Sequence, residues 1–160
     1  MANVEIKLKG REALQRRLKE KRNKLISYLN IRLLQLAEDA VVYSKDNKGY
    51  KDRTGNLKNS ISFALYLDGE LITSQEGQLP KPEATEEGQQ GVSNALAEYA
   101  QKEGVVAPKG YSLVIVAGMR YGKYVEENHS YNVLQLTKHY LREEMKGIFE
   151  EVINTINSDG

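Results

Sequence analysis

The chain has 160 residues and a formal net charge of +1, and it contains no cysteine. This length suits a single domain over residues 1–160, and the balanced charge gives no overall electrostatic reason to bind nucleic acid or an anionic membrane. The lack of cysteine excludes disulfides and thiolate metal sites. No apolar run approaches the ~20 residues that span a bilayer, and the first residues do not resemble a signal peptide, so we expect synthesis in the cytoplasm.

A short strand and a long helix are predicted for the first part of the chain. Over residues 3–9, Val4, Ile6 and Leu8 alternate with charged residues, which is the pattern of a half-buried strand. From about residue 11 to residue 43, apolar side chains recur every three or four positions and form one stripe: Leu14, Leu18, Leu25, Leu29, Leu33, Leu36, Ala37 and Ala40. Because Lys and Arg crowd the first half of this helix, we expect packing to tighten toward residues 29–41. The basic half should project toward solvent or a partner.

Two strands joined by a tight turn are predicted next. Residues 61–67 have strand composition, and their alternate apolar side chains share one face: Ile61, Phe63, Leu65 and Leu67. Asp68-Gly69 is typical of a two-residue hairpin turn. Residues 70–73 are therefore expected to return as the partner strand.

The segment 74–91 is predicted to be a mobile loop. Leu79 is its one large apolar residue, and such a stretch buries too little surface to offset the entropy of ordering. Long irregular loops in small domains are often functional, so we expect this loop to become ordered in an assembly. Ser93 should then cap a short helix that ends at Gly104. Residues 111–117 are apolar enough for a central strand covered on both faces.

The last part of the sequence predicts a second long helix. Asn132 and Gln135 form a capping-box signature, and apolar residues keep helical spacing from there almost to the C-terminus. The order of elements indicates an α+β fold, a small mixed, mainly antiparallel sheet packed on one face by two long helices, with an extra short helix. The side chains expected between the long helices and the sheet are Leu29, Leu33, Leu141, Met145, Ile148 and Val152.

The sequence contains no residue pattern that indicates catalysis. His129 and His139 are ten residues apart, which is not a helical metal-binding pair, and surface or partly packed imidazoles are expected instead. Glu126 and Glu127 are adjacent and should diverge rather than act together. We therefore predict a chain that is not an enzyme and has no catalytic, cofactor-binding or metal-binding residues.

Four of the ten tyrosines lie on the last predicted strand or shortly after it: Tyr111, Tyr121, Tyr124 and Tyr131. They suit two roles that do not exclude each other. Tyrosine rings can cover a core while each hydroxyl reaches water or backbone. Tyrosine also supplies large contact area at low entropic cost in subunit interfaces.

Two short elements resemble one protein family. Residues 52–61 contain a Thr-Gly-x-Leu-x-x-Ser-Ile string, formed by Thr54, Gly55, Leu57, Ser60 and Ile61. Residues 121–126 contain a Tyr-x-x-Tyr-Val-Glu string. With the short strand and long helix before them, these elements resemble the tail-completion, or head–tail joining, proteins of long-tailed double-stranded DNA phages. The order and rough spacing match over nearly the whole chain.

The first of these elements has a structural and a functional interpretation. As a helix-to-strand corner, Thr54 and Gly55 would make a tight turn, Leu57 and Ile61 would anchor it, and Ser60 would bond a backbone group. Alternatively, its polar side chains would touch a neighbouring subunit. The candidate subunit-interface residues of the two elements are Arg53, Thr54, Gly55, Lys58, Asn59, Tyr121, Tyr124 and Glu126.

The resemblance implies a structural virion protein of a tailed phage or prophage, forming part of the head–tail connector or tail-completion ring. Its partners would be copies of itself in a cyclic homo-oligomer and neighbouring head–tail or tail-tube proteins, with no membrane and no cofactor. It would be made in the bacterial host cytoplasm and reside in the virion. The alternative is a small DNA-binding protein that uses the basic half of the first helix. Because those basic residues lie on several faces and are mixed with Glu12 and Glu20, direct nucleic-acid binding is the less favoured role.

Overall fold

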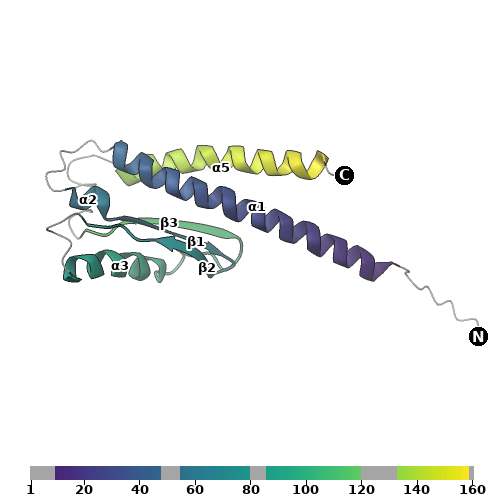
Figure 1. Ribbon diagram of the computed structural model, residues 1–160, viewed down its shortest axis with the longest axis horizontal. Coiled ribbons are helices and arrows are strands. Elements are labelled where there is room, and N and C mark those ends of the chain that lie inside the picture. The colour runs from purple at the N-terminus through teal and green to yellow at the C-terminus, as the bar shows by residue number, and fades with distance from the viewer. Residues whose placement is uncertain (1–9, 48–54, 80–85, 120–132, 159–160) are drawn as a thin grey trace, which may run out of the picture.

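A computed structural model describes residues 10–47, 55–79, 86–119 and 133–158, and Figure 1 shows its layers. The helices are α1 (Arg11–Asp46), α2 (Asn56–Asn59), α3 (Glu86–Ala100) and α5 (Val133–Ser158), and the strands are β1 (Ile61–Leu67), β2 (Glu70–Gln75) and β3 (Tyr111–Ala117). The helices α1 and α5 lie on one face of the sheet, and α3 covers the other face. The predicted α+β class with two long helices on one face is confirmed. The strand expected over residues 3–9 lies outside the described residues.

The sheet has the order β2-β1-β3, and both pairs of neighbouring strands are antiparallel. Of the described strands, β1 is therefore the central one, so the prediction that residues 111–117 form the central strand is wrong. The expected cover on both faces of β3 is present, because Leu113 and Ile115 face α1 while Val114 and Val116 face α3. A continuous apolar run indicates that both faces of a strand are covered, but it does not indicate which strands lie beside it.

The β1–β2 hairpin forms as the sequence predicted. Asp68 and Gly69 take positive φ values of 53° and 85°, as a tight two-residue turn of this kind requires. Tyr66 pairs with Leu71, and Leu65 pairs with Thr73. This register leaves Ile72 as an extra residue, and such a β-bulge increases the local twist of the outer strand.

The main core lies between the two long helices and the sheet. Its buried members are Leu29, Leu33, Leu36, Leu65, Ile148 and Val152, with Leu141 and Met145 packed at its margin. The six core residues predicted from the sequence thus all lie here, four buried and two partly buried. Burying each such side chain contributes about 1.5–3 kcal/mol, so this layer is the principal source of stability.

The first fourteen residues of α1 extend beyond the sheet, and we call this segment, Arg11–Lys24, the arm (Figure 1). All of its residues are exposed. Leu14 and Leu18 continue the apolar stripe of the helix, yet each is 59% exposed. The expectation that packing tightens toward residues 29–41 while the basic half projects is confirmed. No described helix is both long and apolar enough to cross a membrane.

The prediction that residues 74–91 form one irregular loop is wrong for the parts that the structure describes, whereas mobility of the segment and its ordering in an assembly stay predictions. The strand β2 continues to Gln75, and α3 already begins at Glu86. Between them, Gly77 and Leu79 are buried. The side chain of Gln89 ties this stretch to α3, because its Nε2 donates to the Gly77 carbonyl oxygen at 2.7 Å and its Oε1 accepts from the Leu79 N–H at 3.1 Å. Residues 80–85 lie outside the described residues.

The predicted N-cap at Ser93 is also wrong, since α3 begins seven residues earlier. Ser93 lies inside the helix, where its hydroxyl donates to the Glu76 carboxylate and so links α3 to the chain leaving β2. The helix packs through Val92 and Leu96, both buried. The early start was missed because residues 86–91 have no large apolar side chain to reveal a helical period.

Candidate interaction surfaces

From Gly55 onward, the Thr-Gly-x-Leu-x-x-Ser-Ile element forms a densely packed corner at one end of the sheet, and Thr54 lies outside the described residues. Gly55 adopts a φ of 78° and precedes the single-turn helix α2, and the next residues run directly into β1. Leu57 and Ile61 are buried, and the Ser60 hydroxyl donates to the Leu57 carbonyl oxygen at 2.8 Å. The expected anchoring of the corner by these three side chains is confirmed.

Two other segments pack directly against this corner. Gly77 lies so close that a methyl group at its position would be 2.4 Å from the Asn59 carbonyl oxygen, and its N–H donates to the Ser62 hydroxyl at 2.9 Å. The Gly118 N–H, just beyond β3, donates to the Ser60 carbonyl oxygen at 3.0 Å. The chain that continues toward the second resembling element therefore leaves the sheet beside the first one.

The structure places only some of the predicted interface residues. Gly55, Lys58 and Asn59 lie on the corner and are partly exposed. The other five candidates lie outside the described residues: Arg53, Thr54, Tyr121, Tyr124 and Glu126. For the residues that can be placed, the structural role of the corner is established, and contact with a neighbouring subunit stays a prediction.

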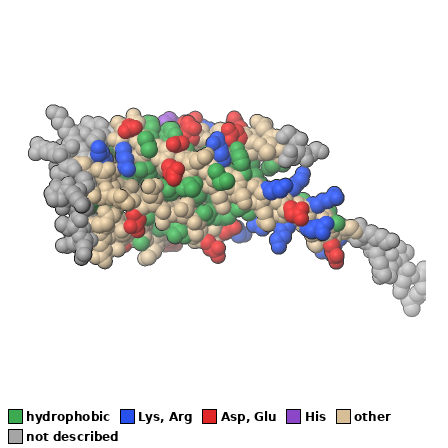
Figure 2. Space-filling view, viewed as in Figure 1, with side chains coloured by type: hydrophobic (Ala, Val, Ile, Leu, Met, Phe, Trp, Pro, Cys, Tyr) green, Lys and Arg blue, Asp and Glu red, His purple; other side chains and the backbone are tan. Residues whose placement is uncertain are grey.

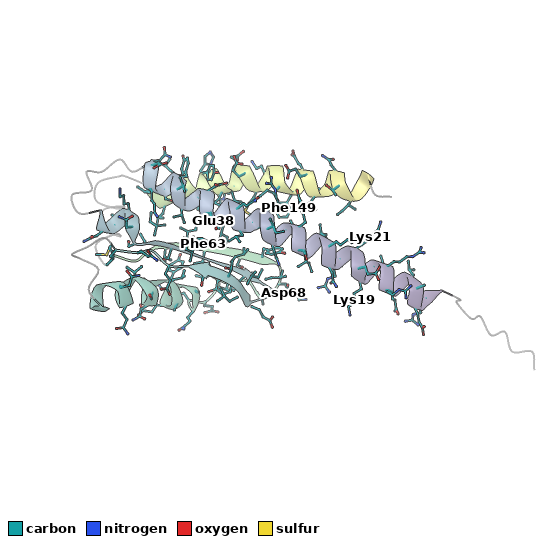
Figure 3. All side chains as sticks on the ribbon, in the orientation of Figure 1. Lys19, Lys21, Glu38, Phe63, Asp68 and Phe149 are labelled. Atoms are coloured by element: carbon teal, nitrogen blue, oxygen red, sulfur yellow. The ribbon has the colours of Figure 1, made fainter. Side chains whose placement is uncertain are left out.

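The arm forms a second surface with a strongly basic character. It contains seven Lys or Arg residues and two Glu residues, for a net charge of +5. Figure 2 shows Lys and Arg side chains gathered over the projecting end of the molecule, and Figure 3 shows Lys19 and Lys21 on opposite sides of the helix. The charge therefore surrounds the helix, while Leu14 and Leu18 add an apolar strip.

A groove separates the base of the arm from the end of α5. Its walls are Lys21, Arg22, Lys24, Leu25, Tyr28, Val152, Thr155 and Ile156. Below the groove the two helices are joined at their outer edge, where the Glu151 carboxylate accepts from Arg32 at 3.0 Å and from the Tyr28 hydroxyl at 3.1 Å. Sequence reasoning missed this groove, because helical periodicity shows that both helices are amphipathic but not where they diverge.

The β1–β2 hairpin forms a third surface, which sequence reasoning also missed. Leu71 and Ile72 are 56% and 37% exposed on β2, and the hairpin segment 68–76 carries three carboxylates, Asp68, Glu70 and Glu76. No Lys or Arg occurs between residues 61 and 79. The turn with Asp68 lies at the end of the sheet from which the arm projects (Figure 3). The signal that could have found this surface is the local net charge of residues 61–79, which the net charge of +1 for the whole chain conceals.

Titratable groups give no catalytic arrangement in the described part of the chain. Among those residues, no group of His, Asp or Glu side chains could hold a metal ion. His139 is exposed on α5, and His129 lies outside the described residues. Burial, and secondarily the charge of Asp68, raises the pKa of Tyr111, whose hydroxyl donates to Asn30 Oδ1 at 2.6 Å. Tyr111 thus packs on α1 as a core-covering tyrosine, whereas Tyr121, Tyr124 and Tyr131 are not described.

Comparison with family models, curated proteins and solved structures finds no match for this chain. The surfaces must therefore be judged by their own chemistry. The corner is tightly packed through backbone contacts, the arm is basic with an apolar strip, and the hairpin is acidic with exposed apolar residues. These three regions therefore differ from one another in packing, charge and exposed apolar area.

Proposed function

We propose that this chain is a structural, non-enzymatic protein of a tailed phage or prophage, forming part of the head–tail connector or tail-completion ring. The observation that carries the proposal is the corner at α2. The first element that resembles this family forms the corner, and the chain leading to the second element leaves β3 beside it through the bond between Gly118 and Ser60. The chain that leads toward the second element thus leaves β3 at the end of the sheet where the first element enters β1.

The shape and charge of the molecule support a role in a ring. A subunit of a cyclic assembly presents two different faces, because its head-to-tail contacts join unlike surfaces. The packed corner and the basic arm lie at opposite ends of the molecule and differ in chemistry (Figures 1 and 2). The proposed partners are further copies of this chain and the neighbouring head–tail or tail-tube proteins. The protein would be made in the bacterial host cytoplasm and incorporated into the virion without a cofactor.

Deleting the gene from a phage or inducible prophage that carries it tests this proposal. Electron microscopy of the lysate should show DNA-filled heads separate from tails, or tails whose ends are abnormal. A plasmid copy of the gene should restore joined particles. The intact chain should also be detected in purified particles. Normal yields of joined, infectious particles after deletion would contradict the proposal, as would absence of the chain from purified virions.

The runner-up function is DNA binding through the arm, and its exposed net charge of +5 favours it. If most of the seven basic residues contacted phosphates, affinity for a DNA duplex would fall about 10³-fold or more between 50 and 200 mM salt. The spread of charge around the helix speaks against a dedicated groove-binding face. A titration at several salt concentrations separates the two functions, since a structural subunit should show weak, sequence-independent binding at most.

A further inference from the structure

The apolar strip of the arm, formed by Leu14 and Leu18, is largely exposed, while the base of the arm faces the end of α5 across the groove. At 1.5 Å per residue the fourteen residues of the arm extend about 21 Å, and isolated helices of this length are marginal in water. Leu14 and Leu18 lie on the same stripe as the buried Leu29 and Leu33. The arm therefore has the pattern of a packed helix, yet its apolar strip is largely exposed where a packed helix would meet a second surface.

Charge limits what that second surface can be. The arm carries +5, and the whole chain carries +1, so the rest of the chain carries −4. Two arms brought side by side would place like charges together, which opposes a symmetric arm-to-arm dimer. An acidic surface with exposed apolar side chains is the complementary partner.

The β1–β2 hairpin has this complementary chemistry. Leu71 and Ile72 supply exposed apolar area, Asp68, Glu70 and Glu76 supply negative charge, and no basic residue interrupts the segment. Its outer strand β2 pairs with β1 alone among the described strands. The other exposed apolar strip fits less well. On α5, Phe149 and Ile153 share a helix face with Arg142 and with Lys146, which is paired with Glu143 at 2.7 Å, so this strip has mixed charge and lacks the acidic character of the hairpin.

We propose that the arm of one copy docks on the hairpin, residues 68–76, of a second copy. Leu14 and Leu18 pack near Leu71 and Ile72, while the basic residues of the arm face the hairpin carboxylates. The contact joins unlike surfaces, so where the arm and the hairpin of one copy engage different neighbours, repeated contacts close into a ring or continue as a filament. This docking would explain how copies join in the proposed ring. The expectation that the ring closes within a phage particle rests on the proposed function.

The natural lack of cysteine allows a direct test with the full-length chain. Leu18→Cys and Leu71→Cys change exposed side chains, so both variants should keep the fold. Mixed in equal amounts under mild oxidation and distinguished by a small tag, they should give mostly the mixed disulfide dimer. Mixing Leu18→Cys with Ile153→Cys, whose parent side chain is 56% exposed on α5, provides the matched control and should give only the random yield.

Charge reversal then tests the specificity of the contact. Arg17→Glu with Lys19→Glu on the arm should lower the yield of the mixed dimer roughly tenfold, because attractive pairs become repulsive. Adding Glu70→Lys to the hairpin partner should restore part of the yield. The control reversal, Arg142→Glu on α5, should leave the yield unchanged.

Three results would overturn the docking. One is a mixed dimer no more abundant than the control, and another is a predominance of Leu18→Cys homodimers. The third is a combination of two observations. The mixed disulfide forms only at the random yield, and the charge-reversed arm, Arg17→Glu with Lys19→Glu, loses a salt-dependent binding to a DNA duplex that the original arm shows. That combination would make the arm a nucleic-acid site. Gene deletion separates this inference from the proposed function. A failed cross-link with blocked head–tail joining rejects the docking alone, and a specific cross-link with normal joining rejects the phage role alone.

Discussion

The two halves of α1 share one helix and one apolar stripe, yet they differ in what covers them. From Leu29 to Val41 the stripe is buried against the sheet and α5, whereas Leu14 and Leu18 in the arm are largely exposed. The transition lies near Asn30, where the hydroxyl of Tyr111 at the start of β3 donates to Asn30 Oδ1 at 2.6 Å. Periodicity thus identifies a helix that is built to pack, and only the positions of the other elements decide where it does.

The largest expected effect comes from removing a side chain of the buried half. Leu33 is 2% exposed, and Leu33→Ala should lower the free energy of unfolding by about 2–5 kcal/mol, because the cavity cannot fully collapse. Leu18→Ala, on the same stripe in the arm, should change it by less than about 0.5 kcal/mol. Urea denaturation of the two variants measures the difference. Equal destabilisation by both would show that the arm packs on its own chain.

The packed corner at the other end of the sheet should be nearly as sensitive. Gly77→Ala puts a methyl group against the Asn59 carbonyl oxygen and the backbone of Ser60, and it should cost roughly 1–3 kcal/mol. Gly91→Ala is the matched control, since it lies in the exposed interior of α3 with nothing nearby. That substitution should stabilise the protein by about 0.4–1 kcal/mol. Thermal melts of both variants would reveal whether the corner is as tightly packed as its backbone contacts indicate, and an unchanged melt for Gly77→Ala would contradict it.

A smaller effect is expected from the buried polar contact between the long helices. The hydroxyls of Ser44 on α1 and Thr137 on α5 are 2.7 Å apart, and each also lies within bonding distance of a carbonyl oxygen in its own helix. Ser44→Ala should cost about 1–2 kcal/mol, because Thr137 loses a buried partner. Combining it with Thr137→Val should cost less than the two single changes together. Strict additivity in this double-mutant cycle would mean that the two hydroxyls do not interact.

The smallest predicted effect lies at the transition between the two halves, where Tyr111 reaches α1. Its pKa is raised in the folded protein by burial and by Asp68, so the folded state favours the neutral phenol. This contribution to stability is present below the unfolded pKa near 10 and is lost as pH rises through the folded pKa. Tyr111→Phe should cost roughly 0.5–1.5 kcal/mol at neutral pH and reduce the alkaline loss of stability. Urea unfolding at pH 7 and pH 11 measures both effects, with Tyr99→Phe on the exposed side of α3 as control. An unchanged alkaline loss in Tyr111→Phe would contradict this assignment.

Features that depend on apolar period or local turn chemistry could be predicted from the sequence. These include α1, α5, the inward face of β1 and the Asp68-Gly69 turn. The helices and the strand have apolar side chains at regular intervals, and the turn has residue types that favour its backbone conformation. The segment 74–79 and the start of α3 could not be predicted, since they are held by Gln89, by Ser93 and by the close approach of Gly77. Such polar and backbone contacts leave no hydrophobic pattern.

Among the interaction surfaces, the sequence indicated the arm and the corner but not the hairpin. The arm stands out as a cluster of basic residues within twenty positions, and the corner contains a recognisable string. The acidic character of residues 68–76 rests on three carboxylates and on the absence of Lys and Arg within the segment itself. Its exposure arises because the helices pack mainly on β1 and β3 and not on β2, which local sequence patterns do not reveal.

Hydrogen–deuterium exchange along α1 in the free chain tests the account most directly. We predict that backbone amides of the arm exchange orders of magnitude faster than those of residues 29–41, because the sheet and α5 hold the second half of the helix. Raising the protein concentration should slow exchange in the arm and in β2 together as copies associate. Equal and strong protection of both halves of α1 in the dilute monomer would contradict the account, since the arm would then be packed without a partner.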